Sequence, residues 1–281
     1  MEDGIIYRGE NESIKNAVSQ AFKDEQLRLS KESGPIPEKL QQFAADARKY
    51  MVEEWFAKMG ISGQELPPAP AIYNVLLSEE VGEASLAIGV KIDLNHFLNA
   101  YSDKDMCEYM EARTLLEEIY HYTAKPVITT GSQNKPVTME SGGLTFYKSK
   151  NRYPQIEEGM AQLFIDHASG FLEKHFPAGH QKIEAIRSSE GNLFLVSSKN
   201  STNTLRPLYP GATILTKEIV DNALGGDCSL IEKARIRRDH LPLARKLKEV
   251  YGEDVYRPVM LATENGAALL ANQLKKARVG E

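Results

Sequence analysis

The chain has 281 residues, enough to bury a substantial core as one large domain or two modest ones. Apolar residues make up 42% and charged residues 26%, which is ordinary for a globular protein and excludes collagen, a coiled coil and a wholly disordered chain. With 34 Lys and Arg against 39 Asp and Glu, the net charge of -5 is mildly acidic, so neither nucleic acid nor an anionic membrane is an expected partner.

The sequence carries no sign of export or membrane insertion. Its first residues, MEDGIIYRGENESIKN, lack the basic region and apolar run of a secretory signal, and no segment approaches the roughly 18 apolar residues of a membrane span. We therefore expect a cytoplasmic protein. The two cysteines, Cys107 and Cys228, lie far apart and in no C-x-x-C arrangement, so neither a disulfide framework nor a cysteine zinc cage is predicted.

Residues 1–65 are predicted to form a helical N-terminal segment. From residue 11 to residue 60, apolar side chains recur at helical spacing on both sides of a break at SGPIPEKL, which predicts two helices. The Gly- and Pro-rich stretch GQELPPAPA, residues 63–71, interrupts regular structure and separates this segment from the rest of the chain.

Residues 66–180 are predicted to combine strands and helices. The stretches 71–77 (AIYNVLL) and 84–94 (ASLAIGVKIDL) are rich in β-branched residues and indicate two adjacent strands, most simply a hairpin. Residues 102–105 (SDKD) offer an N-cap for a helix of about five turns. A turn-rich stretch with short strands comes next, and IEEGMAQLFIDHASGFLEKHF predicts a second helix.

Residues 181–281 are predicted to be a helical C-terminal segment. The helical pattern is broken at RPLYPG and at ALGGD. The charge run EKARIRRDHLPLARKLKE, residues 232–249, carries interleaved aliphatic residues and no aromatic ones. We therefore expect it to form a solvated amphipathic helical surface rather than a nucleic-acid site.

The stretch LLEEIYHYT, residues 115–123, carries the side chains most suited to chemistry. Glu117 and His121 are four residues apart, so on a helix they share one face, about one turn apart, and both can reach one ion. Glu118 lies beside that face, where a carboxylate can hold a water against the ion and accept its proton. A third ligand is still required.

This stretch resembles the catalytic helix of the gluzincins, the thermolysin-like zinc peptidases whose motif is His-Glu-x-x-His, with Glu117 in place of the first histidine. The segment IEEGMAQLF, residues 156–164, is similar to the second helix of that family, where a glutamate is the third zinc ligand. Glu158 is the matching position, and Gly159 matches the small residue after it. Glu157 stands where the family often has asparagine.

The resemblance implies an α+β fold of zincin-like architecture, with a small sheet packed on the motif helix and the ligand helix, a core over residues 66–180 and helical segments on either side. It implies a metal ion held by Glu117, His121 and Glu158. Glu118 would then be the general base of a metallopeptidase-like hydrolase that acts on a peptide or protein. Zinc is the ion of the family, but two carboxylates and one imidazole also suit Mn²⁺ or Fe²⁺, so the ion stays open.

An interpretation without metal stays open beside it. Arg113, Glu117 and His121 follow one another at intervals of four residues, so they can form a ladder of ion pairs worth about 0.2 to 0.5 kcal/mol per exposed pair. The chain would then be a catalytically inactive zincin-like protein that binds a peptide or protein, for example by adding an extended peptide to a sheet edge. Whether the chain is an enzyme stays open.

Other candidates are weaker. Tyr120 and Tyr122 are expected to pack in the core, and His167 lies more than two turns beyond Glu158 on the same predicted helix. His240 resembles, by position, the histidine that binds the transition state in thermolysin-like enzymes. No G-x-S-x-G, Walker-type or G-x-G-x-x-G segment occurs in a strand-turn-helix setting, which disfavours serine hydrolases, nucleotide hydrolases and dinucleotide enzymes.

Overall fold

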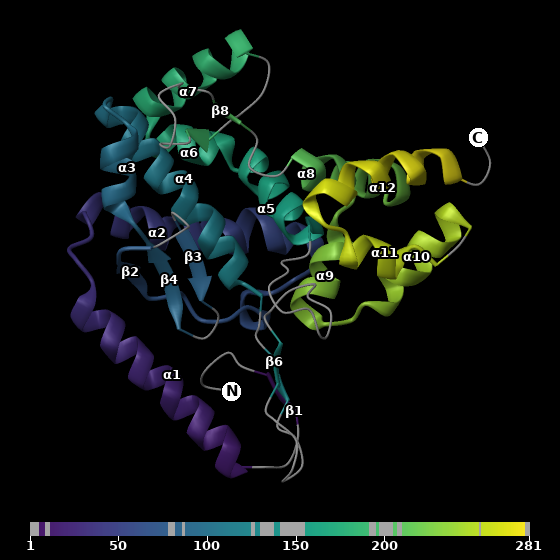
Figure 1. Ribbon diagram of the computed structural model, residues 1–281, viewed down its shortest axis with the longest axis horizontal. Helices are drawn as coiled ribbons and strands as arrows, with labels where there is room; N and C mark the ends of the chain where they lie inside the picture. The colour runs from purple at the N-terminus through teal and green to yellow at the C-terminus, as the bar shows by residue number, and fades with distance from the viewer. Residues whose placement is uncertain are drawn as a thin grey trace.

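Helices predominate among the described residues of the structure, a computed structural model, and short strands there form three small sheets (Figure 1). No helix in the described part of the chain is both long and apolar enough to cross a membrane. The described residues are 6–8, 12–77, 82–85, 88–124, 127–129, 138–140, 155–190, 195–196, 205–206, 210–252 and 254–278.

The N-terminal segment is helical, as the sequence predicts. Its helical elements are α1 (Glu12–Glu32), α2 (Glu38–Tyr50), the π-helical turn η1 (Met51–Phe56) and the 3-10 turn η2 (Ala57–Met59); the short strand β1 (Ile6–Arg8) before them was not predicted. Figure 1 shows α1 extending away from the other helices, and Leu29 is its buried residue. The predicted break at residues 63–71 contains one short 3-10 turn, η3 (Gly63–Glu65), followed by irregular chain, so the break is confirmed.

A three-stranded sheet lies beside the central helices, in the order β2-β4-β3. Its strands are β2 (Ile72–Asn74), β3 (Gly82–Ser85) and β4 (Gly89–Ile92). The strand β4 pairs in parallel with β2 and antiparallel with β3. The two predicted strand stretches are therefore adjacent, but the predicted hairpin between them is wrong.

The reason is a turn inside the stretch 84–94, which the sequence pattern treats as one strand. Gly89 begins β4 with φ at 151°, and a Cβ placed there would lie 2.4 Å from the carbonyl oxygen of Ala71. Glycine permits both this backbone angle and this close approach. The turn makes β3 and β4 the hairpin and leaves β2 as the parallel neighbour of β4.

The predicted motif helix is confirmed as α4 (Lys104–Tyr122). Asp103 is its N-cap and accepts hydrogen bonds from the backbone N–H groups of Asp105 and Met106, both at 3.0 Å. The helix is buried on most sides and packs against α2, α5 and the sheet. A short helix before it, α3 (Leu94–Ala100), was not predicted.

The second predicted helix is confirmed but divides at Ala168, and the C-terminal segment is helical as expected. The ALGGD break is also confirmed, since Gly225 and Gly226 adopt φ of 64° and 86° there. The helical elements are α5 (Gln155–His167), α6 (Ser169–His175), α7 (Pro177–Glu190), α8 (Pro210–Lys217), the π-helical turn η4 (Glu218–Ala223), α9 (Ser229–Arg237), α10 (Leu241–Tyr251), α11 (Tyr256–Leu261) and α12 (Glu264–Ala277).

Two smaller sheets complete the described structure. The strand β5 pairs in parallel with β1 and antiparallel with β6, and β7 pairs antiparallel with β8. Strands are therefore present in the turn-rich stretch after α4, as predicted, and the rest of that stretch lies outside the described residues. The strands are β1 (Ile6–Arg8), β5 (Val127–Thr129), β6 (Thr138–Glu140), β7 (Leu195–Val196) and β8 (Leu205–Arg206).

One hydrophobic cluster joins buried side chains from Leu40 to Leu274, so all three predicted segments contribute to it. Many helices together with a small mixed sheet agree with the predicted α+β class. The zincin-like packing and the segment boundaries at residues 65 and 180 stay predictions. Helix α7 runs through residue 180.

The contact between α5 and α8 is tight enough to test by a single methyl group. At Gly159, an added Cβ would lie 2.0 Å from Thr216 Oγ1 and 2.6 Å from the carbonyl oxygen of Ala212. We expect Gly159→Ala to lower the free energy of unfolding by about 1 to 3 kcal/mol, because α8 must shift to admit the methyl. Urea unfolding measures this change.

The matched control is Gly170→Ala on α6, where nothing lies within 4 Å of the added Cβ. Because alanine favours a helix more than glycine does, Gly170→Ala should leave the free energy of unfolding unchanged or raise it by up to about 1 kcal/mol. Equal losses of stability in the two variants would contradict the packing described for Gly159.

Candidate metal centre

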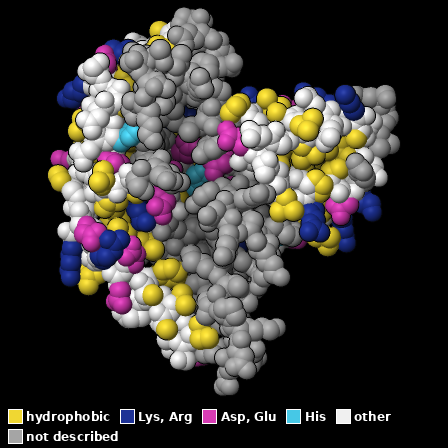
Figure 2. Space-filling view, viewed as in Figure 1, with side chains coloured by type: hydrophobic (Ala, Val, Ile, Leu, Met, Phe, Trp, Pro, Cys, Tyr) yellow, Lys and Arg dark blue, Asp and Glu magenta, His cyan; other side chains and the backbone are white. Residues whose placement is uncertain are grey.

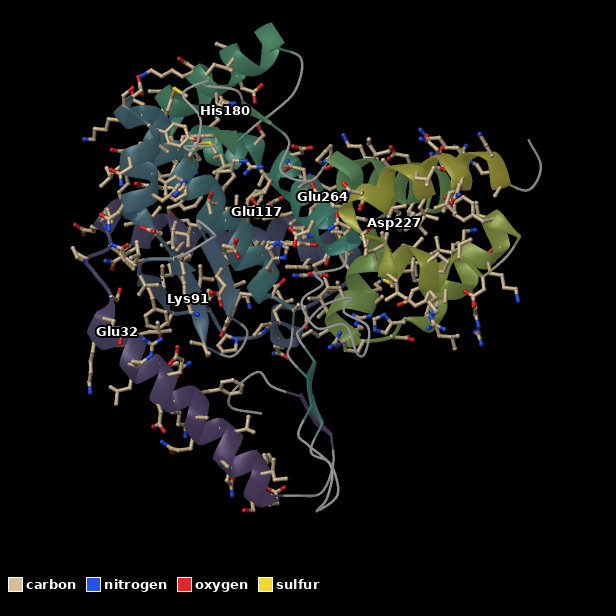
Figure 3. All side chains as sticks on the ribbon, viewed as in Figure 1. Glu32, Lys91, Glu117, His180, Asp227 and Glu264 are labelled. Atoms are coloured by element: carbon tan, nitrogen blue, oxygen red, sulfur yellow. The ribbon has the colours of Figure 1, made fainter. Side chains whose placement is uncertain are left out.

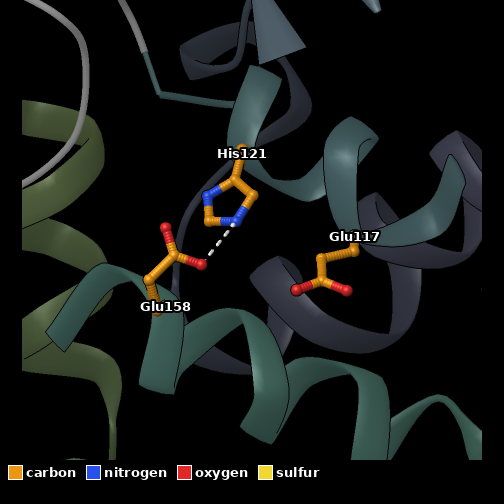
Figure 4. A group of neighbouring side chains, drawn as sticks. All are labelled: Glu117, His121 and Glu158. Carbon is orange, nitrogen blue, oxygen red and sulfur yellow. Dashed lines mark ion pairs between the residues drawn. The ribbon is translucent and has the colours of Figure 1, made fainter. Parts of the chain in front are cut away.

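The three predicted metal ligands come together in the structure. Helix α4 carries Glu117 and His121 on one face, and α5 brings Glu158 opposite them (Figure 4). One possible ligand atom from each lies within 4.8 Å of the others, and this is the one such group within the described part of the chain. Figure 3 places Glu117 near the middle of the molecule.

Ring packing holds the two ligand helices against each other. Tyr120 of α4 stacks on Phe164 of α5 with ring centroids 5.0 Å apart and planes 14° apart. Both side chains are fully buried, as is Ile156 near the start of α5. Tyr122 is also buried, so the expectation that Tyr120 and Tyr122 pack in the core is confirmed. The relative position of His121 and Glu158 therefore follows from the packing of the core.

The carboxylate of Glu117 is buried and has a cationic neighbour. Arg113 Nη1 donates to Glu117 Oε2 at 3.3 Å, and Arg113 Nη2 donates to Gln162 Oε1 at 2.9 Å. The first half of the predicted ladder is thus present, in a buried rather than an exposed setting. His121 forms its ion pairs elsewhere, with carboxylates of α5.

The two ring nitrogens of His121 face two different carboxylates. Nε2 lies 3.6 Å from Glu158 Oε2, and Nδ1 lies 3.9 Å from Glu157 Oε1. Burial disfavours the charged ring, but the negative charge of Glu158 and Glu157 outweighs it, so the pKa of His121 is raised well above its ordinary value. In the metal-free protein the ring therefore supplies positive charge to this cluster.

Glu118, the predicted general base, lies against the strand β3. A Cβ at Gly82 would lie 2.8 Å from Glu118 Cγ, so the absence of a side chain there leaves room for the glutamate. Burial raises the pKa of Glu118 to about 8; the charge of His121 and a backbone hydrogen bond from Ala84 oppose the rise, and the carboxylates of Glu117 and Glu158 add to it. A pKa near neutrality suits a group that accepts and returns a proton.

A buried ionic network lies beside the centre, and the sequence patterns did not predict it. The expected solvated surface of residues 232–249 is wrong for Glu232 and Arg235, both of which are fully buried on α9. Arg235 donates to the Glu157 carboxylate. Glu232 Oε1 accepts hydrogen bonds from two buried donors, the indole Nε1–H of Trp55 at 2.8 Å and the hydroxyl of Tyr120 at 2.7 Å.

A signal for this burial exists in the sequence. Ala234 and Arg235 stand three and four residues after Ile231, so the three share one face of α9, and that face is the apolar one. Burial alone would raise the pKa of Glu157, but the charges of Arg235 and His121 lower it to about 2. Glu157 therefore stays ionised beside the histidine.

The other predicted candidates lie apart from the ligand group. His167 packs beside Trp55, with ring centroids 5.0 Å apart, and does not belong to the group. His240 Nδ1 lies 2.7 Å from the hydroxyl of Tyr256 and is not among the possible ligands either. The predicted role of His240 in binding the transition state stays a prediction.

The donor set fits a divalent metal ion. Glu117 and Glu158 offer hard carboxylate oxygens and His121 offers one imidazole nitrogen, a combination that zinc, manganese and iron(II) all accept. Figure 2 shows acidic and histidine side chains gathered in the hollowed middle of the face it views. The centre therefore offers two carboxylates and one imidazole within reach of one another.

No family model, curated protein or solved structure matches the chain. The gluzincin resemblance therefore depends on the residues of α4 and α5 themselves.

Metal binding should release protons. The pKa of His121 is raised in the metal-free protein, so at neutral pH its ring must lose a proton before Nε2 can bind an ion. We expect the release of about one to two protons per zinc ion, the second from Glu118. Calorimetric titrations in buffers of different ionisation enthalpy measure this number. Binding without proton release would place the ion away from His121.

The metal-free protein should lose stability as pH rises. The pKa of Glu118 is raised from 4.5 to about 8, so between these pH values the folded chain retains a proton that the unfolded chain has released. Glu118→Gln removes this titration. The free energy of unfolding of the variant, relative to the unaltered protein, should rise by about 2 to 4 kcal/mol across that interval.

Urea unfolding at a series of pH values in the presence of a chelator measures this difference. Glu108→Gln is the control on the same helix, since Glu108 pairs with Lys39 away from the ligand group. The control should show no comparable rise across that interval. A constant stability difference between Glu118→Gln and the unaltered protein would contradict the raised pKa.

Proposed function

We propose that the protein is a metal-dependent hydrolase that cleaves peptide bonds. The convergence of Glu117, His121 and Glu158 from two helices, with ligand atoms within 4.8 Å of one another, is the observation that carries the proposal. The position of Glu118 beside this group supports it, because the same helix then supplies two ligands and a base.

Each residue has a distinct role in this proposal. Glu117, His121 and Glu158 hold the cation, which when bound supplies Lewis acidity to activate a water and polarise the carbonyl group. Glu118 accepts the proton of the attacking water on a carboxylate oxygen and returns it to the departing amine. The burial of Glu117 and Glu158 strengthens their attraction for the cation, because fewer waters compete there.

The strand β3 offers a place for the substrate backbone. In the described part of the sheet its one neighbour is β4, so β3 is an edge strand there, and the backbone of its Ala84 hydrogen-bonds to the Glu118 side chain. An extended peptide can pair with such an edge and lie along it. Because Gly82 of β3 lies against Glu118, a peptide on this edge would pass close to the proposed base.

One observation favours a second candidate, a peptide-binding protein without catalysis. The ion pair between Arg113 and Glu117 already neutralises one proposed ligand without a metal ion. In that case His121 serves as the permanent cation beside Glu158, and the edge of β3 binds the peptide unassisted. The two candidates differ in their response to a chelator.

Glu118→Gln tests the proposed base. With zinc, manganese or iron(II) supplied, the unaltered protein should hydrolyse members of a peptide library, detected by mass spectrometry. The variant should lower the rate by about 10²- to 10⁴-fold, because the amide cannot accept the proton, while calorimetry shows metal binding retained.

Glu111→Gln is the matched control, since Glu111 is a buried glutamate two turns earlier on α4 that contacts Cys107 instead. It should keep the activity of the unaltered protein. If no metal supports hydrolysis and peptide affinity is the same with and without chelator, the peptide-binding candidate replaces the hydrolase.

A further inference from the structure

Arg235 is the largest fully buried side chain among the described residues. Its guanidinium keeps its charge at any ordinary pH, so it is stable in the interior only with anionic and carbonyl partners around it. Beside Glu232 of its own helix, its partners lie on α5 and at the end of α4, the two helices that carry the proposed metal ligands. Arg235, in the C-terminal segment, therefore contacts the helices that hold the proposed metal ligands.

The guanidinium holds the C-terminal turn of α4. Nη2 donates to the carbonyl oxygens of Tyr120, at 2.6 Å, and His121, at 3.3 Å, while Nη1 donates to Thr123 Oγ1 at 2.7 Å. These carbonyls also accept from the backbone N–H groups of Thr123 and Ala124 in the last turn, and Arg235 adds a charged donor to each of them. The backbone of the histidine ligand is thereby fixed from α9.

The same guanidinium holds the carboxylate that faces the histidine ring. Arg235 Nε donates to Glu157 Oε1, and this same oxygen lies 3.9 Å from His121 Nδ1. The opposite ring nitrogen, Nε2, lies 3.6 Å from Glu158. In metal sites, a carboxylate at the far nitrogen of a ligating histidine sets the orientation of the ring.

We infer that Arg235 is a positioning residue for the metal centre: it fixes the end of α4 and the Glu157 carboxylate so that His121 presents Nε2 to the cation. This inference rests on the proposed function, because metal affinity is its readout. A merely structural Arg235 would tie α9 to the core, and its loss would lower stability without changing the affinity of the folded protein for metal.

The chain offers a matched control on the same helix. Arg237 also ties α9 to another segment, with Nη2 donating to the Gly60 carbonyl oxygen at 2.8 Å and to Glu65 Oε1 at 3.0 Å. These partners lie in the N-terminal segment rather than on α4 or α5, and the Arg237 side chain is exposed. Arg237→Lys therefore removes a guanidinium from α9 without touching the centre.

Calorimetric titration of zinc into the chelator-treated full chain decides between these roles. Arg235→Lys keeps the charge but loses the forked donor geometry, and Glu157→Gln keeps the shape but loses the charge. Each should weaken zinc binding by about 10- to 100-fold in protein that thermal unfolding shows to be folded at the titration temperature. Arg237→Lys should stay within about twofold of the unaltered protein.

The outcomes separate this inference from the proposed function. If the unaltered protein binds zinc and both folded variants bind it equally tightly, Arg235 is not a positioning residue, although the metal centre stands. If the unaltered protein binds no zinc, manganese or iron(II), the proposed function fails and this inference fails with it. If Arg235→Lys does not fold, the zinc affinity of Glu157→Gln decides whether this network positions His121, because that substitution preserves the shape of the side chain.

Discussion

Buried negative charge is the constraint on which the centre of this molecule depends. Carboxylates in a protein interior are stable only when cations or hydrogen-bond donors compensate them. In the metal-free chain, Arg113 pairs with Glu117 on α4, and Arg235 pairs with Glu157 on α5. His121 lies between the two helices and pairs with Glu158. The buried carboxylates concerned are Glu117, Glu157, Glu158 and Glu232.

The fold brings these charges together because its helices meet at one place. Helix α4 is surrounded by core packing, α5 lies against it through the stacked rings of Tyr120 and Phe164, and α9 closes the end of α4 through Arg235. Gly159, the residue after the third proposed ligand Glu158, lets α8 approach α5 closely. The same contacts that build the core therefore set the distances between the proposed ligands.

The sequence predicted the features that depend on local spacing and missed those that depend on distant pairing. Glu117 and His121 share a helix face because they are one turn apart, and the Asp103 cap is equally local. The direction of β2 against β4 and the burial of Arg235 depend on partners far along the chain, which periodicity does not specify. Glu158 lay between these cases, since its place came from resemblance to a known helix.

A metal ion held as we propose would account for the convergence of Glu117, His121 and Glu158 on one point, and diffraction can test this directly. Crystals grown with zinc and measured at its absorption edge should show one anomalous peak about 2.0 to 2.2 Å from oxygens of Glu117 and Glu158 and from Nε2 of His121. The proposed metal site would be contradicted if peaks occurred only elsewhere, or if no peak occurred and the ion pair between Arg113 and Glu117 were intact. The cluster would then be a salt-bridged part of the core.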